Sequence, residues 1–306
     1  MTTISILPRP RVAGAASVVA KRGAGIDHGR AFMAEELTPL FHVPGFGVLP
    51  GAVRRRYNQL HALYFNEQVA FFEQEMLSPA LRALRADRRL PRALAEAVET
   101  FHAEEQRHTA MFRGLNRRAA PEFYGAEDYF FIRLPAAGRG MLRALSGQPR
   151  WLPLVLWLAL LQEERSLYYS KRCLTAGEAL EPRFAAVHRA HLADEAGHVD
   201  WDELLLDWLW PRTPRTLRAI NARLMRWTVA EFFHLPKRSA RHVVGQLARE
   251  FPGAVDARAL CGEMDALATN TGFLRTLYSP QIAPRSFARY AGHAEFAPLA
   301  RLLDTP

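Results

Sequence analysis

The chain has few cysteines, few lysines and no long hydrophobic run. Only two of its 306 residues are cysteines, Cys173 and Cys261, and they lie far apart without a partner motif. This scarcity excludes thiolate zinc and iron–sulfur sites, which need several clustered cysteines, and it fits a reducing cytoplasm. The longest strongly apolar run, residues 151–161, is too short to cross a bilayer. We therefore expect no membrane partner.

The basic charge of the chain comes almost entirely from arginine. The formal net charge is +9, and the 40 basic residues include only three lysines. These residues are spread along the whole chain, and no recognition motif or aromatic–basic module accompanies them, so we expect no nucleic-acid partner. The N-terminus lacks the basic segment followed by an apolar core that marks a secretory signal. Together these features predict a cytoplasmic protein.

Apolar periodicity predicts a nearly all-helical chain. Prolines fall mostly between apolar periodic segments, and β-branched runs are scarce. We expect a flexible arm over residues 1–26 and a single all-helical domain over 27–306, with a bundle core at about 53–210. The predicted long helices are 53–77, 91–116, 152–175 and 182–210, with a helical piece at 141–145 and further helices at 214–234, 237–250 and 255–278.

Three potential metal ligands recur at helical spacing in the fourth long helix. His191 and Glu195 are four residues apart, and His198 follows three residues later, so the three side chains share one helix face. Glu105 and His108 repeat the Glu-x-x-His half of this pattern in the second helix. Two such helices, with one inward glutamate from each of two others, form a carboxylate-bridged dimetal site in a four-helix bundle.

The first and third helices each offer an inward glutamate. Glu67 lies in the apolar stripe of the first helix, and a lone buried carboxylate costs several kcal/mol unless it is paired or metal-bound. In the third helix we prefer Glu164, with Glu163 competing for the same role. Glu104 competes with Glu105 in the second helix, but only Glu105 lies three residues before the motif histidine.

This reasoning predicts a dimetal site with a mixed set of carboxylate and imidazole ligands. The predicted ligands are Glu67, Glu105, His108, Glu164, His191, Glu195 and His198. Such a set suits iron, and manganese is a possible substitute. His188, one turn before His191, either supports the ligands or is exposed. Aromatic residues near the ligands either line a substrate pocket or belong to the core; they are Tyr64, Phe101, Phe112 and Tyr168.

The order Glu, Glu-x-x-His, Glu, His-x-x-x-Glu-x-x-His resembles the non-haem diiron N-oxygenases typified by the p-aminobenzoate N-oxygenase of aureothin biosynthesis. Ordinary ferritin-like oxygenases have only the two Glu-x-x-His units, and the extra histidine of this group is matched here by His191. The separations of Glu164 from His108 and from His191 suit the family and favour Glu164 over Glu163.

The first helix fits the family pattern less closely. The interval from Glu67 to Glu105 is slightly long, which makes Glu73 and Glu75 the alternative ligands. The resemblance covers about residues 53–209, and beyond them only length and composition agree. Arg275, in the C-terminal part, is a candidate for holding a substrate carboxylate.

The resemblance implies a ferritin-like four-helix bundle with a diiron site in its core and additional C-terminal helices. It implies a monooxygenase that uses O2 as co-substrate to oxidise an amine nitrogen toward a hydroxylamine, nitroso or nitro product in specialised metabolism. An external electron donor and a homodimer are further expectations. The ligand set alone leaves two alternatives open, a diiron oxygenase that hydroxylates or desaturates carbon and a ferritin-like iron-binding protein.

Overall fold

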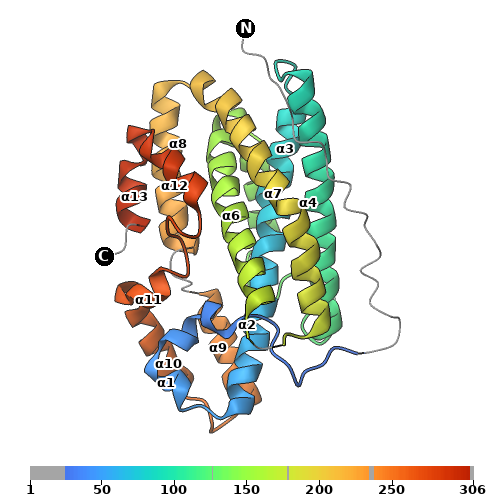
Figure 1. The fold of residues 1–306 in the computed structure, drawn as a ribbon, viewed down its shortest axis with the longest axis vertical. Coiled ribbons are helices and arrows are strands. Elements are labelled where there is room, and N and C mark those ends of the chain that lie inside the picture. Colours follow the sequence, from blue (N-terminus) through green and yellow to red (C-terminus); the bar gives the residue numbers. More distant parts are fainter. Residues whose placement is uncertain (1–24, 126, 178, 234–237, 304–306) are drawn as a thin grey trace.

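The computed structural model describes residues 25–125, 127–177, 179–233 and 238–303. Helices and connecting loops make up this part of the chain, and it contains no β-strand. The long helices run side by side, with shorter helices packed at one flank and at one end (Figure 1). The predicted all-helical class is therefore confirmed. The predicted N-terminal arm lies almost wholly outside the described residues.

Four long helices form the bundle. They are α2 (Gly51–Phe72), α4 (Arg92–Ala119), α6 (Leu152–Thr175) and α7 (Pro182–Leu209). Helix α4 packs against both α2 and α7, and α7 packs along α6 (Figure 1). The second and fourth predicted helices differ from α4 and α7 by three residues or fewer at each end, and the third coincides with α6.

The first long helix does not end at residue 77 as predicted. A π-helical segment, Glu73–Leu77, follows α2 directly, and α3 (Ser78–Ala86) continues from it. Pro79 lies in the first turn of α3, directly after the π-helical segment. A π-helical turn holds more residues than an α-helical turn, and such turns often occur at functional sites. Side chains from Glu73 onward therefore project differently from what an α-helical wheel predicts.

Shorter helices cover the bundle. They are α1 (Pro44–Gly47), α5 (Ala136–Ser146), α8 (Arg215–Thr228), α9 (Ser239–Glu250), α10 (Ala257–Asp265), α11 (Thr271–Leu274), α12 (Pro284–Ala291) and α13 (Ala297–Leu303). The single helix predicted over 255–278 is broken, because the Asn270 side chain accepts a hydrogen bond from the Phe273 N–H and caps a new helix. Helix α12 packs against α6, and α13 packs against α8.

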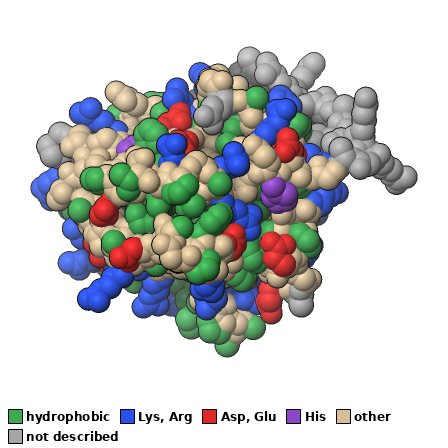
Figure 2. All heavy atoms as spheres, turned by 90° about the horizontal axis from the view of Figure 1, so that it is seen from below, with side chains coloured by type: hydrophobic (Ala, Val, Ile, Leu, Met, Phe, Trp, Pro, Cys, Tyr) green, Lys and Arg blue, Asp and Glu red, His purple; other side chains and the backbone are tan. Residues whose placement is uncertain are grey.

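The buried apolar side chains of the bundle and of the surrounding helices belong to one connected core. Seen from below, basic and acidic side chains are interspersed around hydrophobic ones rather than gathered into a field of one sign (Figure 2). Within the described ranges, each helix is too short or too polar to cross a membrane. Apolar side chains of this core surround the motif residues in the interior of the bundle.

Candidate metal centre

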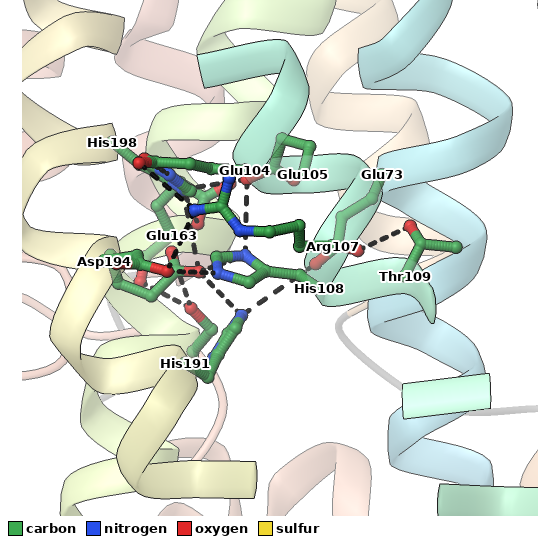
Figure 3. Close-up of polar contacts among 12 residues, drawn as sticks. Glu73, Glu104, Glu105, Arg107, His108, Thr109, Glu163, His191, Asp194 and His198 are labelled. Atoms are coloured by element: carbon green, nitrogen blue, oxygen red, sulfur yellow. Dashed lines mark hydrogen bonds and ion pairs between the residues drawn. The ribbon is translucent and has the colours of Figure 1, made fainter. Parts of the chain in front are cut away.

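The two motif helices bring five side chains together inside the bundle. Helix α4 carries Glu105 and His108, and α7 carries His191, Glu195 and His198, each no more than 2% exposed. Ligand atoms of the two glutamates, His108 and His198 all lie within 4.8 Å of one another. Figure 3 shows the three histidines directed toward a common centre between the helices. These five residues lie together as their spacing predicts.

The facing atoms of this cluster are at contact distance. His198 Nδ1 is 2.8 Å from Glu105 Oε1, and His191 Nε2 is 2.6 Å from Glu195 Oε1. His108 Nδ1 is 3.3 Å from Glu195 Oε1. Within the described part of the chain, both Glu105 oxygens and the Nδ1 atoms of His108 and His198 are buried without a hydrogen bond of acceptable geometry. Buried polar atoms that converge without hydrogen bonding to one another fit ligands of a metal ion.

The outer nitrogens of two histidines contact carboxylates. His108 Nε2 is 3.1 Å from Asp194 Oδ2, and His198 Nε2 is 3.0 Å from Glu104 Oε2. The half-exposed Arg107 lies 3.3 Å from Glu104 and 3.7 Å from Asp194. This arrangement orients each imidazole so that its Nδ1 faces the centre, as is usual for histidines that bind metals.

Sequence reasoning missed these supporting carboxylates. It treated Glu104 only as a competitor of Glu105 and did not consider Asp194. The signal was present, because an acidic residue directly precedes the glutamate of each Glu-x-x-His motif. Adjacent residues leave a helix about 100° apart, so the two neighbouring carboxylates of each pair reach different partners.

On the first helix it is Glu73 that reaches the centre. Its Oε1 lies 3.9 Å from His191 Nε2, and its Oε2 accepts a hydrogen bond of 2.8 Å from the Thr109 hydroxyl. Ligand atoms of Glu73, His108 and His191 lie within 4.8 Å of one another (Figure 3). Glu73 is the first residue of the π-helical segment and one of the two alternatives to Glu67.

The predicted position of Glu67 at the centre is wrong. Its carboxylate accepts hydrogen bonds from the Tyr124 hydroxyl at 2.7 Å and from the backbone N–H groups of residues 130–132 at 2.8–3.0 Å. Six residues at 100° each separate Glu67 from Glu73, so the two carboxylates leave the helix on different faces. The other alternative, Glu75, is also used elsewhere, because it pairs with Arg143 at 2.8 Å.

On α6 the helix phase is shifted by one residue from the prediction. Glu163 Oε2 lies 4.0 Å from His198 Nδ1, at the centre. The preferred candidate, Glu164, points away from the centre toward α12, where its carboxylate accepts hydrogen bonds from the N–H groups of Arg285 and Ser286 at 2.8 and 2.7 Å. Glu164 therefore caps the start of α12. The prediction that it lies at the centre is wrong.

The buried carboxylates of the centre lie so close together that only nearby positive charge stabilises their ionised forms. Burial, and then the charge of Glu105, raise the pKa of Glu73 to about 7. Burial and the neighbouring Glu195 raise the pKa of Glu163 well above its usual value. Glu195 is buried as well, but the charges of His191 and His198 hold its pKa well below the usual range. Two divalent cations would neutralise the four carboxylates of Glu73, Glu105, Glu163 and Glu195, so the donor set fits a dimetal centre.

A small cavity adjoins this centre. Its lining residues are Phe65, Gln68, Val69, Phe72, Glu73, Gln162, Glu163, Arg165, Ser166 and His191. The cavity is therefore open to three of the residues at the centre. It has room for little more than a water molecule.

None of the four aromatic residues predicted for a pocket is among those that line this cavity. Phe101 packs on His198 and Phe112 on His191, with ring centroids 4.5 and 5.0 Å apart. The Tyr64 hydroxyl accepts a hydrogen bond from Gln68, and Tyr168 is half-buried beside Tyr169.

Two further candidates also lie away from the cavity. His188 is buried, lies 3.2 Å from the Ser170 hydroxyl, and burial lowers its pKa to about 3, so it is a neutral histidine of the core. Arg275 is exposed.

The helical bundle and its buried cluster of glutamates and histidines place the chain among ferritin-like proteins with a dimetal site in the bundle core. Residues 23–264, most of the chain, match the family described as P-aminobenzoate N-oxygenase AurF. The chain therefore belongs to this family of diiron N-oxygenases, and it is an enzyme. In a comparison with curated proteins, none matches it.

Proposed function

We propose that this enzyme holds two iron ions with Glu73, Glu105, Glu163, Glu195, His108, His191 and His198 and oxidises a primary amine at nitrogen. The convergence of buried carboxylate and imidazole atoms from four helical segments is the observation that carries the proposal. Every predicted ligand except Glu67 and Glu164 is retained, and each of these two is replaced by a glutamate of the same helical region. Manganese suits the same donors.

The reaction has a simple balance. One oxygen atom of O2 is added to the amine nitrogen, the other leaves as water, and an external donor supplies two electrons with two protons. The bound irons supply O2 activation. Repetition of this step would take the amine through a hydroxylamine toward nitroso and nitro products.

The residues around the centre have separate roles in this proposal. Thr109 holds the Glu73 carboxylate by its hydrogen bond, and the Ser166 hydroxyl lies 3.4 Å from Glu195 Oε2. Asp194 and Glu104 hold the outer nitrogens of two histidines and so keep their Nδ1 atoms directed inward. Phe65, Val69 and Phe72 line the adjoining cavity with apolar surface and limit access of water to the nitrogen.

The biological setting is part of the same proposal. We infer one helical domain over residues 27–306, a homodimer, a cytoplasmic location and a role in specialised metabolism. The ligand set alone is also compatible with oxidation at carbon, so the test has to identify the atom that is oxidised.

Product analysis tests this function. The iron-loaded enzyme is incubated with a panel of arylamines and amino acids, a chemical reductant and isotopically labelled O2, and the products are examined by mass spectrometry. Labelled oxygen on nitrogen supports the proposal. Labelled oxygen only on carbon, or desaturation, would replace it with the alternative oxygenase, and uptake of many irons per chain would indicate storage.

A further inference from the structure

The side chains that would bind the metal ions are each at most 5% exposed, so an ion reaches them from water only if part of the protein moves. The polar groups just outside the centre come closer to solvent. Asp194 and Glu104, which contact the outer nitrogens of His108 and His198, have side chains that are 19% and 11% exposed. A continuous set of polar contacts therefore leads from the centre to the surface between α4 and α7.

One side chain covers the outer end of this set. Arg107 Nη2 lies 3.3 Å from Glu104 Oε1 and 3.7 Å from Asp194 Oδ2 (Figure 3). The positive group thus occupies the place, next to two carboxylates, that a metal ion would take on its way inward. The Arg107 side chain is itself 54% exposed. Solvent weakens ion pairs of this kind, so the guanidinium can turn out into water at small cost.

The small cavity that adjoins the centre is unsuited to the passage of a cation. The buried guanidinium of Arg165 lines it, together with apolar side chains such as Phe65. Among its lining residues the carboxylates are those of Glu73 and Glu163, which belong to the centre. A divalent ion on this side would have to pass a like charge in the protein interior, where charges repel one another more strongly than in water.

We propose that divalent metal ions enter the centre between α4 and α7 and that Arg107 is the gate of this path. In its closed position Arg107 holds the carboxylates of Glu104 and Asp194. When it turns into water, an iron(II) ion takes its place, and the two carboxylates pass the ion inward beside the imidazoles of His108 and His198. Carboxylate and imidazole donors, which iron(II) binds well, line the whole path. This inference rests on the proposed function, because it assumes that the centre holds iron.

A gate changes the rates of metal uptake and release but not the affinity. Arg107 closes the path whether the centre is empty or filled, so its removal should affect both states equally. We expect Arg107→Gln to raise both rates about tenfold, the factor that corresponds to the loss of two partly exposed ion pairs. The Kd should stay within about threefold of the wild-type value, because solvent and salt screen the exposed charge.

Both rates can be measured on the full-length protein with cobalt(II), which binds to the same donors and absorbs visible light. Uptake by protein freed of metal is followed by stopped-flow absorbance. Release from the cobalt-loaded protein is followed after addition of a chelator, at concentrations where the rate no longer depends on the chelator. Neither measurement needs O2, a reductant or an amine.

Two further variants serve as comparisons. Arg92→Gln removes an exposed arginine of the same helix, which pairs with Glu96 at 2.9 Å, and both rates should remain those of the wild type. Arg107→Lys retains the charge but loses the planar fork that reaches two carboxylates at once. Its rates should lie between those of the wild type and Arg107→Gln.

Several outcomes would overturn the inference. Unchanged uptake and release in Arg107→Gln would mean that metal enters elsewhere, and an equal rise in Arg92→Gln would show an effect of net charge alone. Faster release with unchanged uptake would make Arg107 a positioning residue that keeps the two carboxylates on their histidines. Failure of the proposed function would look different, because the protein would then bind neither cobalt nor iron at the centre.

Discussion

The two adjacent glutamates of α6 provide a sharp test of the site, because one faces the metal centre and the other caps a helix. Glu163→Ala removes one of four carboxylates that balance two divalent ions. We expect iron affinity to fall at least tenfold, or about 1.4 kcal/mol, with the helical fold retained. Because its own pKa is raised well above the usual value by burial and by Glu195, loss of this carboxylate should not destabilise the metal-free protein.

Glu164→Ala should lower the thermal stability of the protein without lowering its iron content. It leaves the N–H groups of Arg285 and Ser286 at the start of α12 without their acceptor. Loss of such a cap costs about 1–2 kcal/mol, which is a decrease of about 2–4 °C in melting temperature for a chain of this size. The iron content should remain that of the wild type.

Elemental analysis and scanning calorimetry of the two variants, prepared in parallel, measure both effects. The reasoning is refuted if Glu164→Ala loses iron while Glu163→Ala keeps it. That result would mean that α6 is rotated by one residue from the position described above.

The other predictions concern the remaining helices of the centre. Glu67→Ala should destabilise the fold by several kcal/mol, because each buried donor left without its acceptor costs about 1–3 kcal/mol, but the variant should retain iron. Glu73→Ala should lose iron and keep its helix content. Circular dichroism and iron analysis distinguish the two variants. Asp194→Asn should weaken iron binding about 10–100-fold, measured by competition with a chelator, and unchanged affinity would contradict its supporting role. His191→Ala should keep a substantial fraction of its iron, but its rate of N-oxygenation should fall by more than tenfold, or about 1.4 kcal/mol in barrier. If product mass spectrometry finds no decrease in this rate, His191 is a packed core residue.

Helical spacing accounts for the part of the centre that could be predicted. His191, Glu195 and His198 lie three and four residues apart, and Glu105 and His108 three apart, so any regular helix places each set on one face. Both sets lie on unbroken α-helices, α4 and α7. No tertiary information was needed to bring each set together.

The two misplaced glutamates show where periodicity fails. Helix α6 is buried on two sides, against α7 and against α12, so Glu163 and Glu164 are both buried at 5% exposure and an apolar pattern cannot separate them. Only the start of α12, more than a hundred residues later, explains why Glu164 points away from the metal centre. On the first helix Glu67 is buried for a different reason, because its carboxylate holds the backbone of residues 130–132.

The central claim is that this bundle holds two metal ions between α4, α6, α7 and the π-helical segment after α2. Diffraction from crystals of the iron-loaded protein, recorded on both sides of the iron absorption edge, tests it most directly. We predict two anomalous peaks about 3.5–4 Å apart, contacted by Glu73 and Glu163 as well as by the motif residues. A single peak, or no peak within reach of Glu105 and Glu195, would contradict the account.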